Sequence, residues 1–249
     1  MNVAAYLGRI GYKGKVSTTI ETLRGLHRAH LLSVPFENLD ISLGRQILCN
    51  EDAFLRKIVE RHRGGFCYEM NGAFAALLRT IGFEVTLLSA RVPNEDGSYG
   101  PEFDHLALRV DLDTPWLADV GFGDSFLDPL RLETGVEQTQ AGRIFRILGS
   151  DGSLHIERAE VAGSWEKQYS FTLQPRRIED FAAMCHYHQT SPDSHFTRKR
   201  LCTIATPEGR ITLSDMKLIV TRDGIKEERK LESEEEVQAV LMQTFEVTL

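Results

Sequence analysis

The spacing of apolar residues changes near Phe83, and this change constrains the fold more than any other feature of the sequence. Before Phe83, apolar residues recur at helical spacing, as along one face of a helix. After it, short segments rich in β-branched and aromatic residues alternate with turn signals such as Asp96-Gly97. The sequence therefore predicts an α+β protein, with a helical N-terminal part followed by an antiparallel sheet or barrel.

Helices are predicted in the first part from their capping residues as well as their periodicity. Ser17 or Thr18 is expected to cap one helix and Asn50 the next, because their side-chain oxygens can accept the free N–H groups of a first turn. A further helix is expected to run from about Cys67 to Gly82, where the glycine supplies a C-terminal signal.

The pattern changes again in the last part of the chain. Residues 145–159 predict a β-hairpin, residues 211–231 predict two or three strands, and Ser233 is expected to cap a final helix. No flexible linker marks the boundaries, so we expect the parts to pack around one cleft. The predicted domains are residues 1–83, residues 84–195 and residues 196–249.

Composition argues against several classes of protein. Of the 249 residues, 42% are apolar, which is enough for a large core, and the formal charge is −7. Lysines and arginines are dispersed without a basic stripe, so nucleic acid is not an expected partner. No apolar run approaches the roughly 20 residues that span a bilayer, and no signal peptide is recognised. We therefore expect a cytoplasmic protein without membrane contact.

The cysteines are expected to be free thiols. Cys49, Cys67, Cys185 and Cys202 are far apart and form no CxxC pair. Thiols are the usual state in a chain without a secretion signal. A metal site is not expected, because the run that begins at Cys185 lacks a second pair of ligands. The useful question is which thiol is reactive.

Cys67 has the neighbours of a reactive thiol. Gly64 and Gly65 precede it and let the backbone approach a bound molecule. At a helix N-terminus, free N–H groups and the helix dipole would favour the thiolate and could receive an oxyanion. Arg63 and Glu69 flank the cysteine with opposite charges, and a pair between them would fix the loop. The plain alternative is that Cys67 is a small buried residue.

A thiol nucleophile needs a base and a group that orients the base. His105 begins one apparent strand, and Asp119 lies near the end of another. Adjacent antiparallel strands would bring the imidazole beside the carboxylate, which stands among apolar residues and needs a partner there. Taken singly, His105 would be a surface residue and Asp119 a turn residue. Together with Cys67 they predict a Cys–His–Asp site.

These segments resemble the arylamine N-acetyltransferases. The resemblance rests on RGGFCYE (63–69), FDHLAL (103–108) and LADVGFGD (117–124), with VPFENLDI (34–41) and HQTSPDSHF (188–196) in addition. It implies a helical domain, a β-barrel and an α/β lid, the first two forming a papain-like core. It also implies transfer of acetyl from acetyl-CoA to an arylamine, hydrazine or hydroxylamine, a role in xenobiotic metabolism, and no tightly bound cofactor.

The resemblance assigns roles to the predicted triad. It implies that Cys67 is acetylated, that His105 is its proton partner and that Asp119 is the third member. The reaction is then a ping-pong scheme through an acetyl-cysteine thioester.

The loop after Asp119 and two aromatic residues are the expected binding elements. Gly121, Phe122, Gly123 and Ser125 are expected to hold acetyl-CoA, because backbone N–H groups of such a loop can contact phosphates. The alternative for this loop is an ordinary turn at the end of a strand. Phe36 and Phe122 are expected to face the aryl ring of the acceptor, and the alternative for both is a place in the core.

The same triad would serve other functions. A cysteine hydrolase, either a peptidase or an amidase, would pass the acyl group to water. A biosynthetic acyltransferase would close an amide within a larger molecule. A binding module that kept the fold is a third alternative, against which the intact triad argues.

Overall fold

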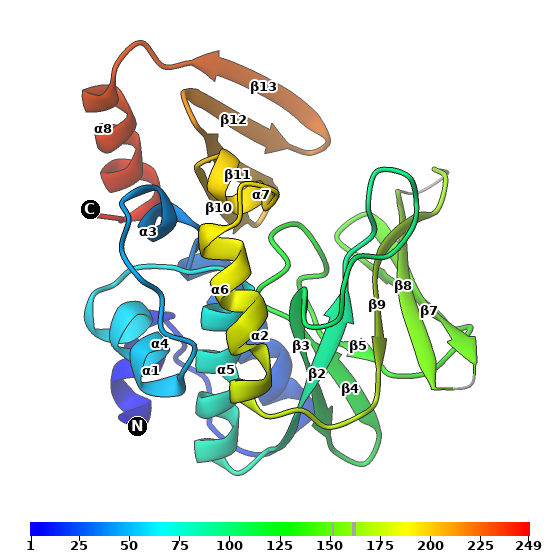
Figure 1. The fold of residues 1–249 in the computed structure, drawn as a ribbon. Coiled ribbons are helices and arrows are strands. Elements are labelled where there is room, and N and C mark those ends of the chain that lie inside the picture. The colour runs from blue at the N-terminus through cyan, green and yellow to red at the C-terminus, as the bar shows by residue number, and fades with distance from the viewer. Residues whose placement is uncertain (151, 161–162) are drawn as a thin grey trace.

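The computed structural model describes residues 1–150, 152–160 and 163–249. Its N-terminal part is helical, as predicted (Figure 1). The elements of this part are α1 (Val3–Arg9), α2 (Ile20–Ser33), α3 (Leu39–Ser42), α4 (Glu51–Leu55), the π-helical turn η1 (Arg56–Glu60) and α5 (Cys67–Ile81).

Capping residues explain where the first helices begin. Asn2, Thr19 and Asn50 cap α1, α2 and α4, and each accepts a backbone N–H with its side-chain oxygen. The cap of α2 is therefore Thr19, and the predicted Ser17 or Thr18 is wrong by one or two positions. The cap at Asn50 is confirmed, whereas the sequence pattern does not predict α1.

Helix α5 lies at the centre of the molecule. All its residues from Cys67 to Leu78 are buried, because several elements pack around it. The carboxylate of Glu69 accepts the N–H of Phe66 (3.1 Å) and so holds the first turn. The helix ends at Gly82, whose φ of 113° is one that glycine adopts readily. The predicted helix from about Cys67 to Gly82 is confirmed.

The middle of the chain forms an eight-stranded antiparallel sheet that curls into a nearly closed barrel (Figure 1). Its strand order is β5-β4-β3-β2-β9-β8-β7-β6. The predicted hairpin of residues 145–159 is β7–β8, although Asp151 at its turn lies outside the described residues. The strands are β2 (Glu84–Arg91), β3 (His105–Asp111), β4 (Pro115–Ala118), β5 (Leu130–Arg131), β6 (Glu137–Gln140), β7 (Arg143–Ser150), β8 (Ser153–Glu160) and β9 (Glu166–Thr172).

The C-terminal part forms a second antiparallel sheet, of order β1-β10-β11-β12-β13. The short strand β1 comes from the N-terminal part and pairs Phe36 with Thr203, a connection that the sequence pattern does not predict. Helix α8 begins after its predicted cap Ser233 and buries Val237 and Leu241 against this sheet. The elements are β1 (Phe36–Glu37), β10 (Leu201–Thr206), β11 (Gly209–Ser214), β12 (Lys217–Arg222), β13 (Ile225–Lys230) and α8 (Glu234–Phe245).

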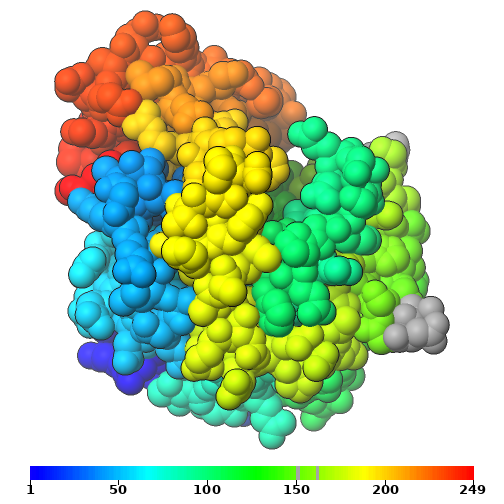
Figure 2. Space-filling view, viewed as in Figure 1, coloured from blue at the N-terminus to red at the C-terminus, as the bar shows by residue number. Residues whose placement is uncertain are grey.

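A helical segment connects the barrel to the second sheet. It consists of the 3-10 turn η2 (Ile178–Phe181), α6 (Ala182–Thr190) and α7 (His195–Arg198). Figure 2 shows this segment, in yellow, as a ridge between the N-terminal helices in blue and the barrel in green. None of the helices in the described part of the chain is long and apolar enough to span a membrane.

A buried cluster of charges holds the segment that leads into α5. Lys57 Nζ lies 2.9 Å from Glu69, 2.8 Å from Asp40 and 3.5 Å from Glu37. Arg63 pairs with Glu37 (2.8 Å) and Asp40 (3.2 Å). The hypothesis of an Arg63–Glu69 pair is therefore wrong, because each residue pairs with another member of the cluster. Burial raises the pKa of Glu69 to about 7, although Lys57 opposes this.

We predict that Lys57→Met lowers the free energy of unfolding by about 3–5 kcal/mol, because it leaves buried carboxylates unpaired. Urea denaturation measures the change. The folded-state pKa of Glu69 is raised above 4.5 to about 7, so the stability due to its proton is complete at low pH and is lost as the pH rises through about 7. The loss of stability caused by Lys57→Met should therefore be larger at about pH 8, where Glu69 is ionised, than at about pH 5, where Glu69 carries a proton.

The exposed neighbour Arg56 provides the control for this prediction. Arg56→Met should change stability by less than about 0.5 kcal/mol. An equally small effect of Lys57→Met would mean that Arg63 alone balances the three carboxylates.

Candidate active site

Cys67 is the first residue of α5, and the loop after β4 closes over it. A Cβ atom on Gly121 would lie 2.8 Å from Cys67 Cα and 2.8 Å from Asn71 Nδ2. Only glycine fits this approach without displacing the helix. On the other side, the backbone of Gly64 lies against the carbonyl oxygen of Pro35, which likewise leaves no room for a side chain. These contacts fix the position of Cys67.

His105 and Asp119 are brought together by neighbouring strands, as predicted. His105 begins β3, and Asp119 directly follows β4, which pairs antiparallel with β3. The distance between His105 Nε2 and Asp119 Oδ2 is 2.7 Å, and both side chains are buried. A carboxylate can only accept, so Nε2 carries the hydrogen and Nδ1 is left free. This hydrogen bond fixes the tautomer of His105.

The other oxygen of Asp119 is also fully used. Its Oδ1 accepts from Asn71 Nδ2 (2.8 Å) and from the N–H of Gly121 (2.9 Å). Burial alone would raise the pKa of Asp119, but His105 and these donors hold the pKa of the carboxyl below its ordinary value. Asp119 is therefore ionised at neutral pH.

Two residues that the sequence pattern does not single out position this group. Asn71 donates to Leu106 O (2.6 Å) and accepts from Val120 N (2.9 Å), so it joins α5 to β3 and to the loop after β4. His27 Nε2 accepts the N–H of Asp119 (3.0 Å), and burial lowers the pKa of His27, which keeps this nitrogen free to accept. Asn71 stands one helical turn after Cys67, a spacing that could have signalled its role.

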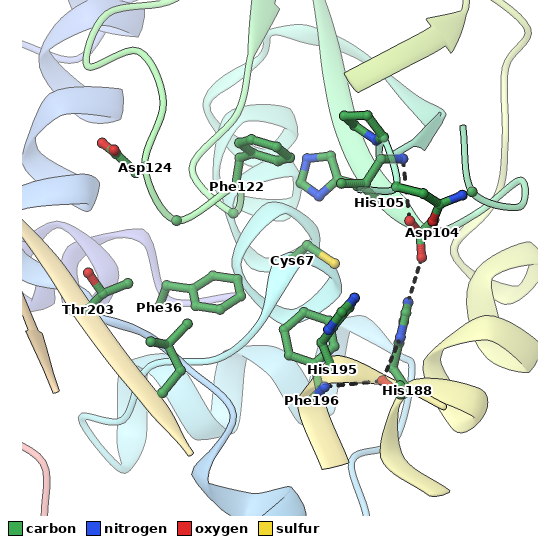
Figure 3. Close-up of a pocket in the computed structure, with 18 of the residues that line it drawn as sticks. Phe36, Cys67, Asp104, His105, Phe122, Asp124, His188, His195, Phe196 and Thr203 are labelled. Atoms are coloured by element: carbon green, nitrogen blue, oxygen red, sulfur yellow. Dashed lines mark hydrogen bonds and ion pairs between the residues drawn. The ribbon is translucent and has the colours of Figure 1, made fainter. Parts of the chain in front are cut away.

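Cys67 and His105 both line a cavity of about 620 Å³, and Figure 3 shows them with other residues around it. The thiol is 3% exposed. Burial raises the pKa of Cys67 well above its ordinary value, and the carboxylates of Asp104 and Asp119 raise it further. The N–H groups of Leu106 and Tyr68 act in the opposite direction. Burial thus acts against the thiolate that the helix N-terminus, which is present as predicted, was expected to favour.

Aromatic side chains form much of the wall of this cavity. Phe36 and Phe122, the two residues predicted to face the aryl ring of the acceptor, both line it. The ring centroid of Phe122 lies 5.2 Å from that of His105. Phe196 is a third lining aromatic, 6.2 Å from Phe36 between ring centroids, and the sequence analysis does not single it out as part of the wall. The sequence indication for Phe196 was its place in segment 188–196, one of the segments that carry the family resemblance. This segment contributes several residues to the cavity lining.

Comparisons with known proteins all point to one family. A family model described as N-acetyltransferase matches residues 19–249. Arylamine N-acetyltransferase 1 of Homo sapiens is 35% identical, covering 100% of this chain and 95% of its own. Arylamine N-acetyltransferase of Mycolicibacterium smegmatis is 36% identical, covering 100% of this chain and 93% of its own. The structure of Mycobacterium marinum arylamine N-acetyltransferase in complex with CoA superposes with a TM-score of 0.92 at 31% identity, covering 99% and 93% of the two chains.

The chain belongs to the arylamine N-acetyltransferase family.

Residues of the loop predicted to hold CoA line two different cavities. Gly121, Phe122 and Gly123 line the cavity that contains Cys67. Ser125 lines a second cavity, of about 780 Å³, and its buried Oγ has no hydrogen-bond partner among the described residues. Asp124 lines both cavities, so they adjoin at this residue.

A cluster of arginines surrounds Asp124 at the junction. Its carboxylate lies 2.7 Å from Arg143, 3.2 Å from Arg158 and 3.3 Å from Arg210. Burial alone would raise the pKa of Asp124, but these guanidinium groups hold it below its ordinary value. The sequence analysis does not identify this cluster, because its members come from β7, β8 and β11 and no local spacing links them.

No group of three or more His, Cys, Asp or Glu side chains in the described ranges is arranged to hold a metal ion. Cys185 and His188 of the run considered for metal are both buried, and His188 contacts Asp104 instead.

Proposed function

We propose that this protein is an acetyl-CoA:arylamine N-acetyltransferase in which Cys67, His105 and Asp119 form the catalytic triad. One observation supports this most strongly. A buried thiol at a helix N-terminus lines the same aromatic-walled cavity as an imidazole whose tautomer is fixed by an ionised aspartate. Nucleophile, base and orienting group are thus present together.

In the first half-reaction, His105 Nδ1 takes the proton of the Cys67 thiol as the sulfur attacks the acetyl carbon. The bond between this carbon and the coenzyme sulfur then breaks, and the proton passes from His105 to the departing thiol. Because one thioester replaces another, this step is near energetic balance. Backbone N–H groups near the sulfur, such as that of Tyr68, are suited to stabilise the oxyanion.

In the second half-reaction, an uncharged amine attacks the carbonyl of acetyl-Cys67. The carbon–nitrogen bond forms, the carbon–sulfur bond breaks, and His105 accepts the amine proton and returns it to the sulfur. Formation of the amide makes this step favourable. Asp119 stabilises the imidazolium in both half-reactions without taking its proton. The scheme is ping-pong, since the first product leaves before the acceptor binds.

We propose that acetyl-CoA is a co-substrate that binds across both cavities. Its reacting end must reach Cys67, and Gly121, Phe122 and Gly123 are the proposed contacts there. Coenzyme phosphates are anionic, and Arg143 and Arg210, which line the second cavity and pair with Asp124, are the proposed contacts for them. The unpartnered Ser125 Oγ supports a polar ligand at this place. We propose Phe36 and Phe122 as the wall for the aryl ring.

Mass spectrometry of the protein incubated with acetyl-CoA alone tests the proposal. We expect one acetyl group on the peptide that contains Cys67, and its rapid loss when an arylamine such as 4-aminobenzamide is added, with formation of the acetylated amine. An unmodified Cys67 peptide would contradict the scheme. If the acetyl group is lost to water at the same rate with and without amine, the protein is a hydrolase.

Three further interpretations are part of the proposal. We propose the division into a helical domain (1–83), a barrel domain (84–195) and an α/β lid (196–249). We also propose that the first two form a papain-like core, because they supply the cysteine and the His–Asp pair respectively. A cytoplasmic location and a role in xenobiotic metabolism are likewise proposed.

A further inference from the structure

A second histidine–carboxylate pair lines the cavity that contains Cys67, and the proposed mechanism does not use it. His188 on α6 and Asp104 just before β3 are both lining residues. His188 Nε2 lies 3.0 Å from Asp104 Oδ1, and the two side chains are 8% and 17% exposed. In Figure 3 they point toward each other, on the side of the cavity toward which the sulfur of Cys67 points.

Ser194 is a third polar neighbour in this pair's surroundings. Ser194 Oγ accepts the N–H of Phe196 (3.2 Å) and lies 3.1 Å from His188 Nδ1. The hydroxyl hydrogen of Ser194 is then free to be donated to Nδ1, which leaves the ring hydrogen on Nε2, facing Asp104.

The carboxylate of Asp104 has acceptor capacity left for a ligand. Its Oδ2 receives one backbone N–H, from Val92, at 3.3 Å. The His188 contact is close, but His188 Nε2 has no aligned hydrogen-bond partner among the described residues. A mostly buried carboxylate with so few aligned donors favours a further donor or a positive charge.

The charges of the cavity wall are arranged asymmetrically. Asp104 and Asp193 lie on the side of α6 and α7, whereas Arg210 is the only lysine or arginine among the described lining residues. Arg210 is paired with Asp124, which Figure 3 shows on the side of the cavity opposite Asp104. On the side of the cavity at Asp104, the described lining thus has carboxylates and no lysine or arginine, and His188 and His195 are its other titratable groups.

We propose that Asp104 and His188 determine acceptor specificity, by selecting aromatic amines that have a positively charged or hydrogen-donating substituent and disfavouring those that have a carboxylate. This inference rests on the proposed acetyl transfer. The aromatic wall continues to the pair, since the ring of Phe196 lies 5.1 Å from that of His188 and nearly perpendicular to it. An aryl ring against Phe196 would thus have its substituent within reach of Asp104. The effect of Asp104 on the pKa of Cys67 agrees with their proximity.

Three acceptors of similar shape test the inference: 4-aminobenzoate, 4-aminobenzamide and (4-aminophenyl)trimethylammonium. The three amines differ in intrinsic reactivity. For each acceptor, the kcat/KM of Asp104→Asn is therefore divided by the kcat/KM of the wild-type protein, and these ratios are compared. Asp104→Asn should lower the preference for the cationic over the anionic acceptor by about tenfold or more, since both ligand charges lose their interaction with the carboxylate. The neutral acceptor should change by less than about threefold. An unchanged preference would overturn the inference.

Asp111→Asn is the matched control, because Asp111 pairs with Arg109 at the end of β3 and does not line the cavity. It should leave the preference unchanged. In Asp104→Asn, the amide oxygen of the new side chain can still accept the N–H of Val92, so the loop should keep its conformation. His188→Gln should weaken the preference less than Asp104→Asn, because it retains the charge of Asp104.

Equilibrium binding separates this inference from the proposed function. Phenyltrimethylammonium and benzoate cannot be acetylated, and ligand-observed NMR compares their binding to the wild-type protein without turnover. Tighter binding of the cation, lost in Asp104→Asn, is expected even if no acceptor were acetylated. Equal binding of the two ions, or tighter binding of benzoate, would overturn the inference while acetylation of Cys67 could still succeed.

Discussion

Cys67→Ser should abolish acetyl transfer, with a loss in kcat/KM of about four orders of magnitude or more. A serine hydroxyl fits the site, since Cys67 is a small buried side chain at the first position of α5. Its proton, however, is held far more tightly than that of a thiol, so His105 would be too weak a base to remove it during attack. Steady-state assays with acetyl-CoA and 4-aminobenzamide measure the loss.

Cys49→Ser is the matched control for the nucleophile. Cys49 is the most exposed of the four cysteines, which makes it the thiol that reagents would otherwise reach first. This variant should keep its activity within about twofold, because the substitution is conservative and Cys49 does not line the cavity of Cys67. Substantial residual transfer in Cys67→Ser, together with loss in Cys49→Ser, would show that the wrong thiol has been assigned.

Asp119→Asn should lower kcat by about 10³–10⁴-fold with little change in the fold. Both carboxylate oxygens accept hydrogens: Oδ2 from His105, and Oδ1 from Asn71 and Gly121. An amide has only one accepting oxygen, so its NH₂ group must face either His105 or these donors. If it faces His105, the imidazole takes the other tautomer and Nδ1 no longer accepts the proton of Cys67. In either orientation the negative charge that supports the imidazolium is lost.

The control is Asp128→Asn, because Asp128 pairs with Arg28 at 2.6 Å and does not line the cavity of Cys67. Its activity should stay within about twofold of the wild type. Thermal unfolding of both variants should show that each is folded at the assay temperature. Normal turnover of Asp119→Asn would contradict the orienting role of the carboxylate.

Lowering the pH should remove the negative charge of Asp119 by protonation instead of by substitution. The pKa of Asp119 is held below its ordinary value of 3.8, so its contribution to stability is present above this pH and is lost as the pH falls through the lowered pKa. Asp119→Asn should therefore flatten the acid limb of the stability profile, measured by urea denaturation across that range.

Local structure and the juxtaposition of His105 and Asp119 could be predicted from the amino-acid sequence. Asn50, Gly82 and Ser233 mark helix ends through hydrogen bonds or dihedral angles that depend on near neighbours, and all three were correctly assigned. His105 and Asp119 were also predictable, because β3 and β4 are joined by a short turn and their pairing follows from it.

The way in which distant segments complete the site could be seen only in the folded chain. The pairing of β1 with β10, the arginine cluster around Asp124, and the contact between Asp104 and His188 join residues that are far apart in sequence. The pKa of Cys67 depends on the fold in the same way, because burial raises it, whereas the helix N-terminus that the sequence indicated favours the thiolate. Spacing along a chain reports on hydrogen bonds within one or two turns. Burial, charge pairing and cavity shape depend on every element packed around a residue, and they exist only once the chain has folded.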